Sequence, residues 1–278
     1  MNFSLVKKTI GITAAMLITG QASAALITNW NWTLDSAWTA TTPALGSGVT
    51  GSGLVDVNGT DGYSTISWGT DIGNGQSSLV VQNPELDSTN ASAVAFELTE
   101  VAPGVYGDTQ FATLFTHNNF VIGLPGITEM TLTDYFTLTG LGLAAPSLIT
   151  NPDFDWAFKE TTNTDSGDDC FAADPFDTPC SDILVLKNPA PLQISFQEDG
   201  YNYSILVGAT NLVPLDASAC TEAGEGFPCV GLITEESAST DVQFFIALTA
   251  TKIAEPSALA LMGLGLLGFG FSRRQKRK

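Results

Sequence analysis

The sequence has few basic residues, and their placement limits the classes of partner. Only 10 Lys and Arg stand against 29 Asp and Glu, which gives a formal net charge of -19. Seven of the ten bases lie at the two ends of the chain, and none occurs from Thr9 to Trp156. Clustered Lys and Arg are what bind phosphate backbones. We therefore expect no nucleic-acid partner, and cations as the favoured counterions.

Histidine is rarer still, because His117 is the only one in the chain. A metal site built from several histidines is therefore excluded, and no Gly-x-Ser-x-Gly segment marks a nucleophile elbow. His117 lies at the expected end of a strand, where its two ring nitrogens can hydrogen-bond polar groups at a strand-to-turn corner. We interpret it as a structural histidine, with ligand contact and catalysis as the alternatives.

The central chain also lacks any long stretch with the 3.6-residue hydrophobic period of a helix. Apolar and polar side chains alternate instead, most clearly over residues 30–34, 130–138 and 242–248. Thr, Val and aromatic residues dominate these runs, as is typical of half-buried strands. Asp-Gly turns at 58–62 and 198–200 favour hairpins. The predicted fold is all-β, an antiparallel β-sandwich or jelly roll.

The N-terminal segment has the pattern of a secretory signal peptide. Lys7 and Lys8 precede a short apolar run, and Ala-Ser-Ala ends at residue 24. Small residues at that place are typical of a cleavage site, which would leave Ala25 as the first residue. We therefore predict export across the inner membrane.

The C-terminal segment repeats this arrangement in reverse. An apolar run over residues 258–271 precedes the basic end Arg-Arg-Gln-Lys-Arg-Lys. The run is shorter than the roughly 20 residues of an ordinary transmembrane helix. Local thinning of the bilayer lets a short helix cross, with its basic end in the cytoplasm. The predicted organisation is a signal peptide at 1–24, a β-sandwich domain at 25–254 and a sorting segment with a short transmembrane helix at 255–278.

This last segment resembles the PEP-CTERM sorting signal of Gram-negative bacteria. Ala254 stands where the usual Pro-Glu-Pro core has its first proline. The resemblance implies an exosortase as partner, cleavage near the motif and only transient anchoring in the membrane. It also implies delivery to the cell surface or matrix, in association with exopolysaccharide and biofilm. The residues of the motif and of the arginine pair that carry the resemblance are Glu255, Pro256, Ser257, Arg273 and Arg274.

A second resemblance concerns the segment around the single histidine. Thr116, His117 and Asn119 match the motif of the THxN family of PEP-CTERM proteins. The segments Trp-Asn-Trp at 30–32 and Ser-Trp-Gly at 67–69 are also similar to that family. The family carries no assigned activity, so the resemblance implies no site chemistry.

The four cysteines form two local pairs. In an exported chain an even number of cysteines indicates disulfides, and four cysteines allow three pairings. The short loops favour Cys170 with Cys180 and Cys220 with Cys229. A zinc site is the alternative, but it requires closer Cys-x2-4-Cys spacing.

The loop around the first cysteine pair is acidic. Asp165, Asp168 and Asp169 precede Cys170 and offer the oxygen ligands that calcium prefers. Their spacing does not match an EF-hand loop. Calcium binding and a simply solvated acidic surface are the two interpretations.

Three functions agree with these features. The favoured one is a noncatalytic protein of the cell surface or matrix that associates with extracellular polysaccharide. A calcium-assisted carbohydrate-binding module is the alternative, and a glycoside hydrolase with paired carboxylates is a weaker one. Tryptophans could stack on sugars, although their alternation favours the core for most of them: Trp30, Trp32, Trp38, Trp68 and Trp156.

Overall fold

The computed structural model describes most of the predicted β domain. The predicted signal peptide and the sorting segment lie outside the described residues, and so does the predicted span at 258–271. Within the described part, no helix is long and apolar enough to cross a membrane. The described residues are 25–57, 59–73, 75–83, 95–123, 125–143, 146–161, 170–172, 174–176, 180–188 and 192–253.

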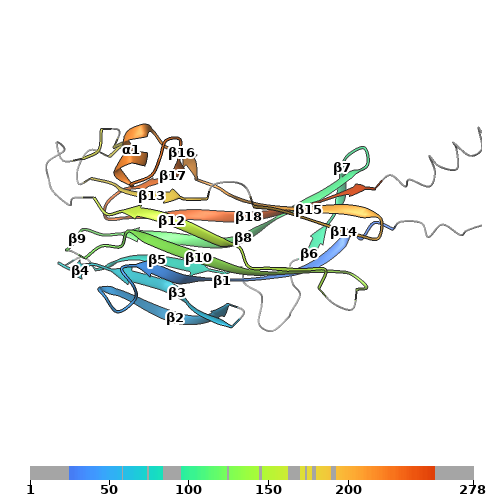
Figure 1. The fold of residues 1–278 in the computed structure, drawn as a ribbon, viewed down its shortest axis with the longest axis horizontal. Coiled ribbons are helices and arrows are strands. Elements are labelled where there is room, and N and C mark those ends of the chain that lie inside the picture. The colour runs from blue at the N-terminus through green and yellow to red at the C-terminus, as the bar shows by residue number, and fades with distance from the viewer. Residues whose placement is uncertain are drawn as a thin grey trace, which may run out of the picture.

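One half of the molecule is a layer of long antiparallel strands centred on β8 and β18 (Figure 1). These two strands pair along most of their length. Strands β2 and β7 are added beside β3 and β8. In pairing order the layer contains β14 (Leu192–Glu198), β15 (Tyr201–Ala209), β18 (Ala238–Lys252), β8 (Val105–Asn119), β5 (Ser77–Gln82) and β3 (Thr60–Trp68), with β2 (Val49–Val57) and β7 (Thr99–Ala102).

The other half is built on the long antiparallel pairing of β1 with β10. It joins the first layer through a single residue pair, Trp38 opposite Tyr63, so sixteen of the eighteen strands in the described residues belong to one curled sheet. In pairing order this half contains β1 (Asn29–Thr42), β10 (Glu129–Gly140), β12 (Asp153–Lys159), β13 (Asp182–Leu186), β17 (Val230–Thr234) and β16 (Val213–Pro214), with β6 (Ala95–Glu97) and β11 (Leu148–Thr150). A separate ribbon pairs β4 (Thr70–Asp71) with β9 (Ile122–Gly123).

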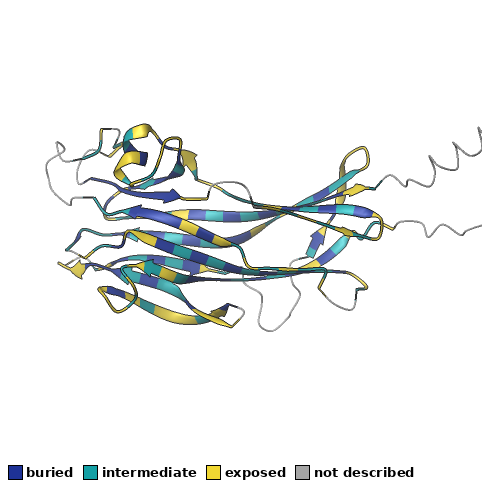
Figure 2. Ribbon diagram, in the orientation of Figure 1, coloured by how far each residue is buried: buried dark blue, intermediate teal, exposed yellow. Residues whose placement is uncertain are grey.

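The two halves pack face to face through aromatic side chains. Phe115 on β8 contacts Trp38 on β1 and Trp156 on β12, with ring centroids 5.8 and 5.2 Å apart. Phe154 and Phe244 meet in the same way at 5.2 Å. Burial alternates along the strands (Figure 2). The prediction of an all-β antiparallel fold with a sandwich-like core is confirmed.

All five tryptophans belong to this core, since none is more than 1% exposed. Tryptophan stacking on a sugar is therefore not available at the surface of the described structure, and the expectation that most tryptophans are core extends to every one. Their large buried area makes them major contributors to the stability of the sandwich.

Both predicted disulfides are present. Cys170 is bonded to Cys180, and Cys220 is bonded to Cys229. The second bond lies under the short helix α1 (Ala217–Glu222), whose first turn is capped by the Asp216 carboxylate. The helix and this bond cover β13 at one end of the molecule (Figure 1).

Candidate functional site

The single histidine lies at the end of β8, with its ring turned into the core. Strand alternation sends His117 and Asn119 inward, and Thr116 and Asn118 outward. The imidazole stacks on Trp68 at 5.7 Å between centroids and meets the edge of Phe158 at 5.5 Å. Nδ1 lies 3.0 Å from the hydroxyl of Thr234. His117 therefore joins one sheet half to the other.

The other residues of the four-residue motif have different surroundings. Asn119 is fully buried and donates from Nδ2 to the carbonyl of Thr234, at 3.2 Å. Thr116 donates to the carboxylate of Asp241 on the outer face of the sheet, at 2.6 Å. The motif is thus divided between a buried polar cluster and an exposed hydrogen bond.

Three carboxylates lie in this same buried region and form what we call the carboxylate trio: Glu160, Asp182 and Glu236. Each offers an oxygen that lies within 4.8 Å of the other two. Glu160 directly follows β12, Asp182 begins β13, and Glu236 lies in the turn between β17 and β18. Because β13 pairs with both β12 and β17, the sheet itself brings these distant residues together.

Hydrogen bonds hold two members of the trio in place. Trp68 donates from Nε1 to Oε2 of Glu160, at 3.0 Å. The backbone N–H of Thr161 donates to Oδ1 of Asp182 at 2.9 Å, and the Thr161 hydroxyl donates to the carbonyl of Cys180 at 2.7 Å. The Cys170–Cys180 disulfide thus lies next to the segment that positions Asp182.

Burial and mutual repulsion dominate the electrostatics of the trio. Burial raises the pKa of Asp182, and the negative charges of Glu160 and Glu236 raise it further, against the opposing hydrogen bonds from Thr161. Burial and Glu160 likewise raise the pKa of Glu236, to about 7. Burial lowers the pKa of His117 to about 3, so its ring is neutral at physiological pH.

Several polar atoms of this cluster have no hydrogen-bond partner within the described structure. They include Nε2 of His117, Oδ1 of Asn119 and Oδ2 of Asp182. A buried polar atom left without a partner costs about 1–3 kcal/mol. Because so many of them occur together, the cluster is a candidate functional site with oxygen ligands suited to a hard cation.

The sequence predictions did not single out this trio. Asp182 lies just beyond the acidic loop closed by Cys170 and Cys180, and Glu160 and Glu236 carried no signal of their own. The one available hint was Asp182 at the start of the apolar run Ile-Leu-Val-Leu. The calcium candidates Asp165, Asp168 and Asp169 lie outside the described residues, as do Glu255, Pro256, Ser257, Arg273 and Arg274.

A second group of potential ligands contains Cys170, Asp174 and Cys180. In sequence these residues lie between Glu160 and Asp182. Its sulfur atoms are joined in the disulfide and are not thiolates, so they do not serve as metal ligands. The carboxylate of Asp174 accepts hydrogen bonds from the backbone and the hydroxyl of Ser181, at 2.8 and 2.7 Å. The disulfide and these hydrogen bonds therefore account for the contacts of this group.

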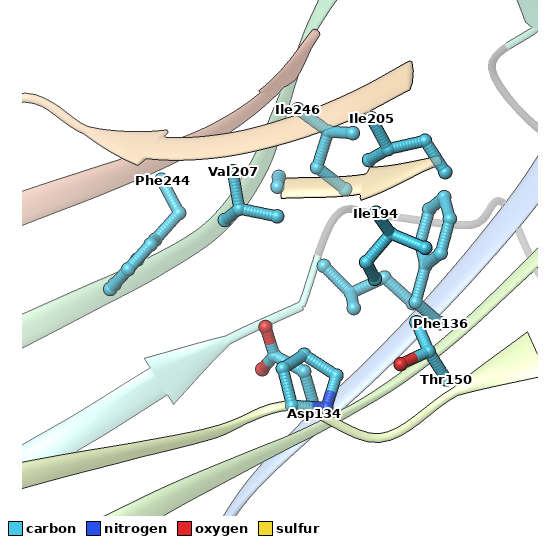
Figure 3. Close-up of a pocket in the computed structure, with 11 residues that line it drawn as sticks. Asp134, Phe136, Thr150, Ile194, Ile205, Val207, Phe244 and Ile246 are labelled. Carbon is cyan, nitrogen blue, oxygen red and sulfur yellow. The ribbon is translucent and has the colours of Figure 1, made fainter. Parts of the chain in front are cut away.

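A pocket lies between the layers, away from the trio. Its lining is apolar except for Asp134 and Thr150, and Figure 3 shows the Asp134 carboxylate facing Ile194, Val207 and Phe244. The enclosed space holds about one water molecule. Burial raises the pKa of Asp134 to about 7, against a hydrogen bond from Ser36. The pocket is too small to hold a sugar.

Comparison with protein families gives one match. Residues 255–274 match the model of the PEP-CTERM protein-sorting motif. No curated protein shows significant similarity to the chain. The matched segment confirms the resemblance noted in the C-terminal residues, and it indicates processing by an exosortase and a surface or extracellular location.

Proposed function

We propose that the protein is exported and then sorted by an exosortase, and that it serves as a noncatalytic component of the surface or matrix in contact with extracellular polysaccharide. The observation that carries the proposal is the PEP-CTERM motif at residues 255–274. In this proposal residues 1–24 are a signal peptide, residues 25–254 are the working domain, and the segment from 255 is a transient membrane anchor.

The two disulfides support the exported location. Disulfides persist in oxidising compartments and are rare in the cytosol. The helix α1 and Phe171, which follows Cys170, pack against the small apolar cluster on β13 near one end of the sandwich. A domain cross-linked in this way resists unfolding outside the cell.

The outer face of β1, β10 and β12 supports contact with polysaccharide. Thr131 and Thr133 alternate along β10 and donate hydrogen bonds to the exposed carboxylates of Asp155 and Asp153, at 2.8 and 2.6 Å. Thr39 on β1 shares a hydrogen bond with Thr133. This continuous array of hydroxyls and carboxylates can hydrogen-bond sugar hydroxyls, directly or through water. Since the tryptophans are buried, we propose this polar face as the contact surface.

We also propose that the chain belongs to the THxN family. His117 and Asn119 would then be conserved parts of the buried cluster, and their role in this proposal is to hold the end of the sandwich together. Thr116, which faces outward to Asp241, would contribute one surface hydrogen bond.

The test uses the producing bacterium and the full chain. Mass spectrometry of surface material should find a polypeptide that starts at Ala25 and lacks the basic end. Recovery of the intact C-terminus from the surface would reject exosortase processing. The same material should be retained on the producer's own polysaccharide without releasing reducing ends.

Matched variants locate the contact surface. Thr131→Val with Thr133→Val should reduce retention several-fold, while Thr249→Val, on the outer face of β18, should not. Release of reducing ends would favour the hydrolase alternative, and retention that requires calcium would favour a calcium-assisted module. If both variants are retained as well as the unmodified protein, this face is not the contact surface.

A further inference from the structure

The carboxylate trio has the composition of a cation site. Its three members come from three separate segments, and their oxygens converge to within 4.8 Å. Asp182 is fully buried and Glu236 is 6% exposed, whereas Glu160 is only half-buried. Two carboxylates are thus shielded from water. The third is partly exposed, so an ion can reach the site from the surface.

A second observation is independent of the acidic clustering. Oδ2 of Asp182 is completely buried and has no hydrogen-bond donor within the described residues. Its partner atom Oδ1 is held by Thr161, so the carboxylate has a fixed orientation, and an oxygen of this carboxylate lies within 4.8 Å of oxygens of the other two acids. Oδ1 of Asn119 is also fully buried and also has no hydrogen-bond donor within the described residues. Native proteins rarely leave such acceptors without a donor or an ion.

The three lysines within the described residues do not supply the missing positive charge. Lys159 forms a salt bridge with Glu222 at 2.9 Å, and Lys187 forms one with Glu129 at 2.6 Å. Lys252 lies at the far end of β18 from Glu236, opposite Tyr201. These are the only basic residues of the domain at 25–254. A bound cation is the remaining way to balance clustered carboxylates without protonating them.

We propose that Glu160, Asp182 and Glu236 bind a calcium ion, with the amide oxygen of Asn119 as a further ligand. The ligand atoms are all oxygens, the donor set that calcium takes in flexible arrangements of six to eight ligands. Zinc prefers sulfur and nitrogen. Magnesium demands near-ideal octahedral geometry and usually binds through one or two carboxylates with several waters, whereas three carboxylates converge here.

The position of the ion defines its role. It ties the end of β12, the start of β13 and the β17–β18 turn into one unit, next to His117 and the Cys170–Cys180 disulfide. The site is therefore structural and locks one end of the sandwich when the protein reaches calcium outside the cell. Binding in the range of extracellular modules, about 10⁻⁴–10⁻³ M, is sufficient for that purpose. The role does not depend on whether the protein binds polysaccharide.

The experiment uses the full-length chain, exported and purified in a mild detergent. Terbium replaces calcium and luminesces when a nearby tryptophan is excited; Trp68 is suited to this because its Nε1 lies 3.0 Å from the Glu160 carboxylate. We expect sensitised terbium emission that excess calcium abolishes, and a Tm higher in calcium than in chelator. Absence of both effects, or an equal Tm rise in magnesium, would overturn the proposal.

Two variants separate binding from folding. Asp182→Asn keeps the acceptor for Thr161 but removes the charge, so it should lose terbium emission and the calcium-dependent Tm rise. In chelator its Tm should equal or exceed that of the unmodified protein, because the repulsion within the trio is relieved. The control Asp134→Asn alters a buried carboxylate outside the trio and should keep the calcium response. A full calcium response in Asp182→Asn would refute the site.

Discussion

The imidazole of His117 lies nearly parallel to the indole of Trp68, with 5.7 Å between the ring centroids and 15° between their planes. These residues come from β8 and from the end of β3, which are separated in the sheet by β5. Both side chains point into the core and reach the elements of the opposite half, His117 through Thr234 and Trp68 through Glu160. The pair therefore links the two halves at the end where the carboxylate trio lies.

Replacing this ring with a methyl group should destabilise the protein. His117→Ala removes the hydrogen bond to Thr234 and leaves a cavity between Trp68 and Phe158. We expect the free energy of unfolding to fall by about 2–4 kcal/mol, since a cavity results and the Thr234 hydroxyl keeps only its longer hydrogen bond to the carbonyl of Asp182, at 3.4 Å. Denaturant unfolding, followed by tryptophan fluorescence, measures the change.

Thr116→Val is the matched control for this substitution. Thr116 is the preceding residue, but it faces outward and makes one surface hydrogen bond to Asp241. Its replacement should cost less than about 1 kcal/mol. Equal stability of the His117 and Thr116 variants would contradict a structural role for the histidine and favour contact with a ligand.

The sequence predicted the local features of this molecule well. Period-2 alternation located the long strands, because a strand with one buried face must alternate. The Asp-Gly turn at Asp199 and Gly200 joins β14 to β15, with positive φ at both residues. The short cysteine loops gave the right pairing since close residues find each other at the lowest entropic cost.

The carboxylate trio could not be predicted in the same way. Residues 160, 182 and 236 share no spacing, and only the order β12-β13-β17 places them together. That order is decided by non-local strand pairing, which a single sequence does not reveal. For His117 the sequence predicted only a position near the end of a strand, and β8 does end at Asn119. Its partners Thr234 and Trp68 come from other strands and could not be predicted.

Asp134 gives the protein a specific dependence on pH. Its carboxyl faces the apolar pocket, and burial raises its pKa from an ordinary 3.8 to about 7. Between these values the folded state keeps the proton and the unfolded state has lost it. The unfolded state then binds fewer protons, so this group makes the free energy of unfolding fall as the pH rises from about 4 to about 7.

Asp134→Asn should remove this loss of stability at rising pH. The amide is uncharged at every pH, so the variant should gain stability over the unmodified protein as the pH rises, by up to about 4 kcal/mol at about pH 8 and little at about pH 4. Urea unfolding at both pH values measures the difference. Asp61→Asn, on the exposed β2–β3 hairpin, should bring no comparable gain. An advantage of Asp134→Asn that is the same at both pH values would show that the carboxyl is not buried as described.

The basic end of the chain should control sorting. Changing both Arg273 and Arg274 to Gln removes two of the five positive charges that, in the proposed sorting, would keep this end in the cytoplasm. We expect processing to fall and the chain to accumulate in the inner membrane with its C-terminus intact, as judged by mass spectrometry of membrane and surface fractions. Lys7→Gln, at the other end, should leave C-terminal cleavage of the exported chain unchanged. Normal release of the double arginine variant would show that the arginine pair is not needed for sorting.

The two disulfides should contribute unequally to stability. Each closes a loop of similar length, and the loop-entropy model gives about 2–3 kcal/mol for either bond. Cys220 and Cys229 are both buried in the small cluster that packs α1 against β13, whereas Cys170 is half-buried. Replacing Cys220 and Cys229 together with Ala should therefore cost more than replacing Cys170 and Cys180, because packing is lost along with the cross-link. Guanidinium unfolding of the two double variants measures the order, after peptide mapping has shown that the remaining pair is bonded. The reverse order would mean that the acidic loop closed by Cys170 and Cys180, rather than the helix-bearing end, is the part whose cross-link limits unfolding.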